Sequence, residues 1–367
     1  MSLLKGRNRE TNLTGELYGK YSFGNMYDNL LSESSLKSIV DIVKNDFQIA
    51  GIVDKYSSFK IMDVGTGRQA LAMGLLGVKA IDHYDISKEH VDRFKKLLNK
   101  KKYNNLNIST SNLDLCKKPL PKNKYDFVYL SGIVHHFSNT AKGIINCANA
   151  VKKNGLIWIY FYRSGTFKWF VNEMIRGLIS TEDIDKFFIS SSINYANGNF
   201  SNSNTSQIMD DFFSPYINLY NPRQYIKFMM ELGFELYSSS HSDPLSDVNH
   251  NKAHHSAVLV FKKMDANINI NGLGQLLQPN DEINQLDRKL YEDKETKSII
   301  DVYFKLKKKI LNKKYDVLRY STCLAMHKIA GPQYYGEPEL PPKRKELKKL
   351  LKTALNYIEK NNINIKV

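Results

Sequence analysis

Cysteine is scarce in this chain of 367 residues, which has three, at Cys116, Cys147 and Cys323. An odd and scattered set favours neither a disulfide framework nor a zinc site, and it is typical of free thiols in a reducing compartment. The sequence also lacks an uninterrupted apolar run near the ~20 residues that a membrane helix needs. Its first residues contain no apolar segment of the kind that a secretory signal has. We therefore expect a cytoplasmic protein that makes no membrane contact.

Negative charge is in short supply, because 53 Lys and Arg face 37 Asp and Glu and leave a net charge of +16. A basic surface attracts phosphate-bearing partners, small or large. The excess is spread along the chain, however, without a known RNA-binding motif or a basic stripe interleaved with aromatic residues. We therefore expect solvated lysine faces rather than a nucleic-acid partner. With 42% apolar and 11% aromatic residues, the chain has enough material for a sizeable core.

Apolar runs of strand length alternate with segments of helical periodicity from residue 59 to residue 162. This alternation predicts a parallel sheet with helices on both faces. Two later strands, in "GFELYSSS" and "SAVLVFKK", follow each other without an obvious helix and predict an antiparallel pair at the sheet edge. The expected strands are Phe59–Val64, Ala80–Tyr84, Leu106–Ser109, Tyr125–Leu130, Leu156–Tyr162 and these two.

Changes in composition divide the chain into three parts. We expect residues 1–54 to form a helical segment that closes over a ligand site. Residues 55–263 are expected to form the α/β domain that carries this site. Within that domain, residues 163–233 form an insertion on the substrate side, with a polar tract, "SSSINYANGNFSNSNTS", that we expect to be mobile. Residues 264–367 predict a helical extension, with amphipathic helices at Lys289–Asn312 and Lys343–Lys360.

The stretch "KIMDVGTGRQALAMG" has two glycines, Gly65 and Gly67, directly after a buried strand. Glycines in a strand-to-helix turn let backbone N–H groups approach a ligand closely. Two adenosine-bearing ligands fit this turn, a nicotinamide dinucleotide and S-adenosylmethionine, and an ordinary turn without a ligand is the third interpretation. The glycine spacing alone leaves all three open.

Two carboxylates after later strands narrow the choice. Asp85 ends the second strand, where it is able to accept both ribose hydroxyl hydrogens while Ile86 packs on the adenine face. Asp114 precedes the fourth strand, where it is able to accept from the exocyclic amine of adenine, with Leu115 alongside. A nicotinamide site explains neither Asp114 nor the antiparallel edge pair, so these positions favour S-adenosylmethionine.

The order "IMDVGTG", "YDIS", "LDL", "YDFVYLSGIVHHF" and "AVKKNGLIWIYFY" resembles the class I S-adenosylmethionine-dependent methyltransferases over about residues 55–262. The resemblance implies a Rossmann-like, seven-stranded and mostly parallel sheet, with S-adenosylmethionine as cofactor. It further implies cofactor contacts, in addition to those of the two acids, from Asp63, Gly65, Thr66, Gly67, Leu130 and Ser131. The third glycine that this family often has is Gln69 here, which narrows the expected pocket.

His135 and His136 follow the fourth strand, where the methyl group of the cofactor is expected to point. Imidazole titrates near neutral pH, so either ring is a candidate general base; we favour His136 and expect the other ring to pack or cap a helix. For the acceptor we expect contacts from Tyr18, Tyr21, Tyr162 and Arg163. No metal is expected, because the cluster His250, His254 and His255 has no Cys or carboxylate at ligand spacing.

The sequence therefore predicts methyl transfer to oxygen or nitrogen of a small, polar and anionic acceptor, such as a sugar nucleotide. Two alternatives remain: an RNA or protein methyltransferase that grips its partner with the basic tail, and a binding protein without catalysis. The end of the chain resembles the closing helices of the dihydrodipicolinate synthase and N-acetylneuraminate lyase family over about 75 residues, without a counterpart of its catalytic lysine. That resemblance implies a helical appendage used for packing or for a homo-oligomer.

Overall fold

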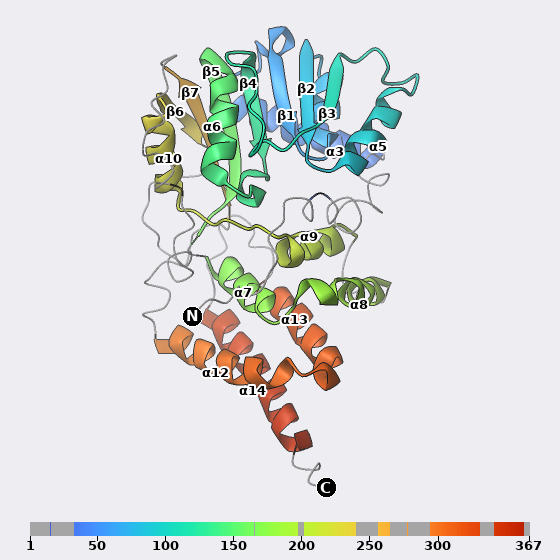
Figure 1. The fold of residues 1–367 in the computed structure, drawn as a ribbon, viewed down its shortest axis with the longest axis vertical. Coiled ribbons are helices and arrows are strands. Elements are labelled where there is room, and N and C mark those ends of the chain that lie inside the picture. The colour runs from blue at the N-terminus through green and yellow to red at the C-terminus, as the bar shows by residue number, and fades with distance from the viewer. Residues whose placement is uncertain are drawn as a thin grey trace.

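A computed structural model describes residues 15, 33–164, 166–196, 202–239, 256–264, 277, 294–330 and 341–362. A sheet with helices on both faces forms one half of the molecule, and a body of helices forms the other half (Figure 1). Within the described residues, no helix has the length and apolar character needed to cross a membrane.

The sheet has seven strands in the order β3-β2-β1-β4-β5-β7-β6. The first five strands of the chain pair in parallel, whereas β7 runs antiparallel to both β5 and β6. The strands are β1 (Lys60–Val64), β2 (Ala80–Asp85), β3 (Ile108–Asn112), β4 (Tyr125–Ser131), β5 (Val151–Tyr162), β6 (Phe234–Ser239) and β7 (Ser256–Lys263). The predicted mostly parallel sheet and its antiparallel edge pair are confirmed.

Side chains alternate across the sheet, so the central strands β1 and β4 each contribute to two cores. Ile61 and Phe127 pack under α3 (Glu33–Ile49), α4 (Arg68–Leu75) and α5 (Lys88–Leu98). Met62 and Val128, their neighbours in the chain, pack under α6 (Thr140–Ala150) and α10 (Pro222–Glu231) on the opposite face. The parallel order also brings the carboxyl ends of β1, β2, β4 and β5 to one edge, where ligands of such sheets bind.

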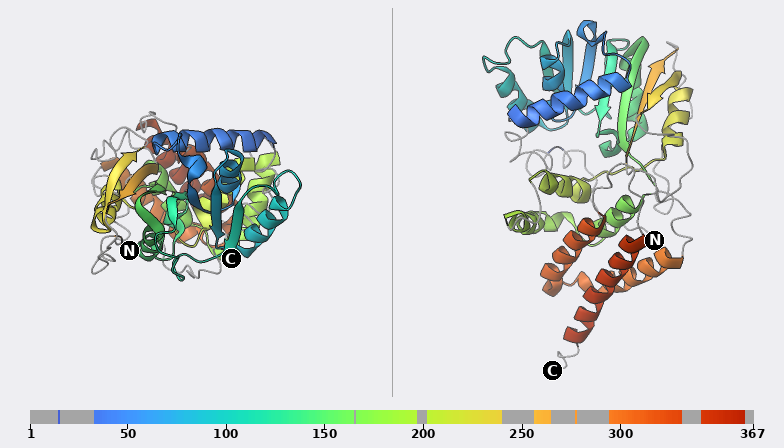
Figure 2. Two further views of the ribbon diagram at one scale, coloured as in Figure 1. Left: turned by 90° about the horizontal axis from the view of Figure 1, so that it is seen from above. Right: turned by 180° about the vertical axis from the view of Figure 1, so that it is seen from behind.

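The helical body joins the insertion to the C-terminal extension. Its helices are α7 (Phe167–Arg176), α8 (Ile184–Ala196), α9 (Asn202–Phe213), α12 (Lys294–Ile310), α13 (Asp316–Ala330) and α14 (Pro341–Asn362). Buried apolar side chains from both segments, such as Phe170, Phe212, Tyr303 and Leu351, belong to one core. Figure 2 shows from a second side that α9 lies between the sheet and the other helices of the helical body.

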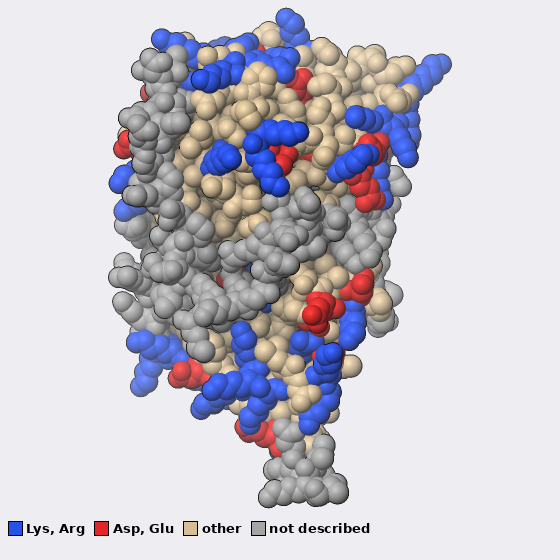
Figure 3. Space-filling model, in the orientation of Figure 1, with Lys and Arg blue, Asp and Glu red and all other residues tan. Residues whose placement is uncertain are grey.

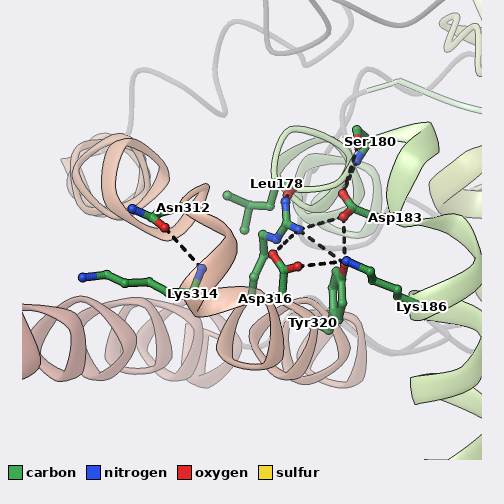
Figure 4. A network of polar contacts seen from close by, with 9 residues as sticks. Leu178, Ser180, Asp183, Lys186, Asn312, Lys314, Asp316 and Tyr320 are labelled. Carbon is green, nitrogen blue, oxygen red and sulfur yellow. Dashed lines mark hydrogen bonds and ion pairs between the residues drawn. The ribbon is translucent and has the colours of Figure 1, made fainter.

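Arg319 of α13 is buried and joins the extension to the insertion through a polar network. Figure 4 shows Asp183, Asp316 and Tyr320 of this network. The Arg319 guanidinium donates to Asp183 and to Asp316 at 2.7 Å each, and to the Leu178 carbonyl at 3.3 Å. Asp183 also accepts from the hydroxyl of Tyr320 at 2.7 Å. Burial alone would raise the pKa of Asp183, but hydrogen bonds from the Ser180 backbone and the Tyr320 hydroxyl and the charge of Arg319 hold it below its usual value.

Two features of the helical body differ from the expectations. Residues 190–196 and 202–206 of the polar tract lie within α8 and α9, where no helix was predicted. The helix α13 was not predicted, because the side chains it buries include Arg319 and Thr322 and therefore weaken its apolar periodicity.

Candidate active site

A cavity of about 310 Å³ lies at the carboxyl edge of the sheet. Residues at the ends of β1, β2, β4 and β5, in the segments that follow β1 to β4 and in helix α9 line it. These are Val64, Gly65, Thr66, Arg68, Gln69, Asp85, Ile86, His90, Leu113, Asp114, Leu115, Cys116, Ser131, Gly132, Ile133, His136, Phe137, Ser138, Tyr160, Tyr162 and Asp210.

The turn after β1 requires glycine at both predicted positions. Gly65 has φ +125° and Gly67 has φ +82°, a left-handed region that other residues rarely adopt. A Cβ atom on Gly67 would lie 2.8 Å from the ring of Phe94. Gly65 and Thr66 line the cavity, and α4 begins directly behind them at Arg68. The turn therefore presents bare backbone and the first N–H groups of a helix to a ligand.

At the end of β2, Asp85 is buried and lines the cavity. Its Oδ1 accepts from the backbone N–H of Ser87 at 2.5 Å, and its Oδ2 lies 3.3 Å from Nδ1 of His90. These contacts orient the carboxylate, and Ile86 supplies an apolar wall beside it. The arrangement fits the predicted ribose acid.

In the loop after β3, the two carboxylate oxygens of Asp114 differ in their hydrogen bonding. Oδ1 accepts from the backbone N–H of Cys116 at 2.9 Å. Oδ2 is buried without a hydrogen bond, and Lys117 Nζ lies 3.6 Å from it. A buried acceptor without a hydrogen bond is costly unless a ligand satisfies it, and the N–H groups of an adenine amine are suitable donors.

The far end of the cavity holds His136, Tyr160, Tyr162 and Asp210. His136 belongs to the 3₁₀ turn η3 (Val134–His136) after β4. Its Nδ1 lies 3.0 Å from the backbone carbonyl of Tyr216, and its Nε2 lies 3.4 Å from Oδ1 of Asp210. This end therefore combines an imidazole, a carboxylate and two phenol rings.

His135 is fully buried and does not line the cavity. Its ring stacks on Tyr162 with centroids 3.7 Å apart, and its Nδ1 accepts from the backbone N–H of Tyr162 at 3.3 Å. Burial, together with the charges of His136 and Lys168, holds the pKa of His135 well below its usual value. A neutral, packed ring supports Tyr162 instead of facing a substrate.

Four other predicted site residues do not line the cavity, namely Asp63, Gly67, Leu130 and Arg163. Burial raises the pKa of Asp63 to about 7, although the N–H groups of Ala70 and Val64 and the charge of Arg68 oppose the rise. Neither oxygen of Asp63 forms a well-aligned hydrogen bond. Tyr18, Tyr21 and the histidine cluster at 250–255 lie outside the described residues.

Sequence reasoning missed several lining residues. Arg68 and Gln69 directly follow the glycine turn, and Tyr160 lies two residues from the predicted Tyr162, so their positions next to predicted contacts were the available signal. Asp210 had no such signal, because only the packing of the insertion brings α9 to the cavity.

Comparison with known proteins gives the class of this site. Residues 62–159, which carry the glycine turn, Asp85, Asp114 and His136, match the model of a methyltransferase domain family. The chain contains a methyltransferase domain. The predictions of a class I methyltransferase, of an enzyme and of S-adenosylmethionine as its cofactor are thereby confirmed at the level of the family.

Solved structures are similar to this methyltransferase at low identity. Magnesium protoporphyrin IX methyltransferase from Synechocystis PCC 6803 is 11% identical, covers 69% of this chain and 100% of its own, and has a TM-score of 0.44. The 1,6-didemethyltoxoflavin-N1-methyltransferase from Burkholderia thailandensis is 11% identical, covers 69% and 88%, and has a TM-score of 0.40. A search of curated proteins found no match to the sequence.

Proposed function

We propose that this cavity binds S-adenosylmethionine through the turn after β1, Asp85 and Asp114. The observation that carries the proposal is the buried Oδ2 of Asp114, which has no hydrogen bond and lies in the same cavity as the oriented carboxylate of Asp85. Two acids and a bare backbone turn match an adenine amine, two ribose hydroxyls and the methionine portion. When bound, the cofactor supplies an electrophilic methyl group on a sulfonium.

For the acceptor we propose a small polar molecule that carries a nucleophilic nitrogen or oxygen. The cavity is of the size typical of small-molecule sites, and its far end is polar. An anionic acceptor was expected because Arg163 was a candidate clamp, but Arg163 is not a lining residue and Asp210 adds negative charge there. We therefore propose a polar acceptor that need not be anionic.

His136 is the proposed general base. Its Nδ1 lies 3.0 Å from a backbone carbonyl, and in the tautomer in which Nδ1–H donates to that carbonyl the lone pair lies on Nε2, which faces the cavity. An acceptor between Nε2 and the methyl group would lose its proton to Nε2 as its lone pair attacks in line. A base of this kind contributes roughly 10²–10⁴-fold to the rate.

The test of this proposal is turnover with a panel of small amines and alcohols, followed as formation of S-adenosylhomocysteine. The His136→Ala variant should lose roughly 10²–10⁴-fold in turnover and keep its affinity for S-adenosylhomocysteine, because the proposed nucleoside contacts lie at Asp85 and Asp114. An exposed control, Asp92→Asn, should keep both properties. Full turnover by His136→Ala would disprove the base. Absence of turnover from the intact chain with every acceptor would favour the binding protein without catalysis.

The partners of the chain are part of the same proposal: a small acceptor, no nucleic acid and a homo-oligomer formed through the C-terminal helices. On the face seen in Figure 3, acidic side chains lie among the Lys and Arg groups. Mixed charges of this kind favour a solvated surface. A salt-dependent shift of transfer or ribosomal RNA at sub-micromolar protein would instead support the RNA methyltransferase, and a monomer in sedimentation would oppose the oligomer.

We further propose the division of the chain at residues 54 and 263, with the reducing cytoplasm as its location. Because α7 and α9 of the insertion share one core with α12 and α14 of the extension, we expect the two segments to fold together. Removal of the extension would expose Phe170 and Phe212 of the insertion, so tail deletion is not a clean test of partner binding. Charge reversal at exposed lysines such as Lys308 and Lys349 is the better test.

A further inference from the structure

Asp210 brings a carboxylate from the insertion into the methyltransferase cavity. Its side chain is 12% exposed, lines the cavity and approaches Nε2 of His136 to 3.4 Å through Oδ1. The two groups come from different parts of the chain, His136 from the turn after β4 and Asp210 from α9. The acceptor end of the cavity is thus completed by the helical body.

The orientation of His136 is fixed on the side away from Asp210. Nδ1 lies 3.0 Å from the carbonyl of Tyr216 and 2.9 Å from the hydroxyl of Ser214. Ser214 also donates to the Tyr216 carbonyl at 3.1 Å. The imidazole therefore keeps Nε2 turned towards Asp210 and the cavity.

Asp210 itself is held by its neighbours on α9. Arg176 donates to the backbone carbonyls of Asp211 and Phe212 at 3.1 and 3.3 Å, and to that of Ser214 at 2.9 Å. The carboxylate of Asp211 lies 3.4 Å from the buried ammonium of Lys168. These contacts fix the end of α9 against α7 and so set the place of Asp210.

We propose that the acceptor is an amine, and that its nitrogen bridges Asp210 and His136. This inference rests on the proposed function and names the acceptor class. A protonated amine has several N–H groups, so one is able to donate to Oδ1 of Asp210 and a second to Nε2 of His136. A hydroxyl has a single hydrogen and is able to donate to only one of these two groups at a time.

The reaction at this bridge balances. The ammonium transfers one proton to Nε2 of His136, and the imidazolium formed is paired with the carboxylate of Asp210. The nitrogen lone pair then forms the new N–C bond as the S–C bond breaks. The electron pair of that bond remains on sulfur, which leaves as the neutral thioether of S-adenosylhomocysteine.

Two nucleoside probes test the amine site without knowledge of the acceptor. Sinefungin carries an amine where S-adenosylmethionine carries the transferred methyl group, whereas S-adenosylhomocysteine has neither. Titration calorimetry on the intact chain should give a dissociation constant at least about tenfold lower for sinefungin, because its ammonium reaches a carboxylate and an imidazole. In Asp210→Asn this preference should fall to below about threefold, while the affinity for S-adenosylhomocysteine stays within about twofold.

The matched control is Asp92→Asn, which changes an exposed acid on α5 and should keep the tenfold preference. Equal binding of both probes by the unmodified chain would overturn the amine site, and so would an unchanged preference in Asp210→Asn. The comparison of the two probes on the unmodified chain tests the amine site even if a variant does not fold. If the chain binds neither probe, the proposed cofactor site is wrong as well. If it binds both probes equally, only the amine site is wrong.

Discussion

His83 and Gly65 are joined by a buried hydrogen bond, in which Nε2–H of the imidazole donates to the Gly65 carbonyl at 2.6 Å. Nδ1 of the same ring lies 2.7 Å from the hydroxyl of Thr110 on β3. Burial lowers the pKa of His83, so the ring is neutral and is able to donate at one nitrogen and accept at the other. This histidine therefore ties the glycine turn to the sheet beneath the cavity.

Replacement of His83 tests this positioning role. In His83→Leu the Gly65 carbonyl loses its buried donor, and we expect about tenfold weaker binding of S-adenosylhomocysteine and a loss of about 1–3 kcal/mol in the free energy of unfolding. Thr110→Val is the matched control, since it removes the other hydrogen bond of the ring and leaves Gly65 paired. It should lower stability but leave affinity within about twofold. Unchanged affinity in His83→Leu would show that the turn holds its shape without His83.

A pair of glycine substitutions separates backbone strain from steric overlap. Gly67 and Gly77 both have positive φ, +82° and +89°. A Cβ on Gly67 would meet the ring of Phe94 at 2.8 Å, whereas a Cβ on Gly77 would meet nothing within 4 Å. We expect Gly77→Ala to cost about 1–2 kcal/mol of unfolding free energy from strain alone. Gly67→Ala should cost about 1–3 kcal/mol more and weaken nucleoside binding. Equal losses of unfolding free energy in the two variants, measured by urea denaturation, would contradict the predicted overlap with Phe94.

Acid stability depends on His327 in the helical body. Burial lowers the pKa of this imidazole to about 3, with a further contribution from the charge of Lys168. Below its unfolded pKa of about 6.5, the unfolded chain binds a proton that the folded chain does not, so stability is lost as the pH falls. Relative to His327→Gln, the unmodified chain should lose about 2 kcal/mol between pH 7 and pH 5. If the free energies of unfolding of the two proteins, measured in urea, changed with pH in the same way, the result would argue against a buried neutral ring.

Much of the fold and part of the site follow from local sequence. The strands are short apolar runs, and side chains at the carboxyl ends of adjacent parallel strands must meet, which is why Asp85 and Asp114 were found. Asp63 also follows this pattern, but it is buried and does not line the cavity. In physical terms, register and side-chain direction limit such predictions.

The acceptor end was less predictable because it depends on tertiary contacts. Asp210 reaches the cavity only after α9 packs on α7, where Arg176 and Asp211 hold it. Neither the polar tract before Asp210 nor the periodicity of α13 indicates that packing. His136 could be placed from its position after β4, whereas its hydrogen bond to Tyr216 could not.

The central claim is that the cavity is a nucleoside site for S-adenosylmethionine, and titration calorimetry of the intact chain with S-adenosylhomocysteine and with NAD tests it most directly. We predict one site for S-adenosylhomocysteine and no binding of NAD. Asp85→Ala should weaken the former by about 1.5–3 kcal/mol, the cost of losing charged hydrogen bonds. Tight binding of NAD or NADP, with no heat from S-adenosylhomocysteine, would contradict the assignment.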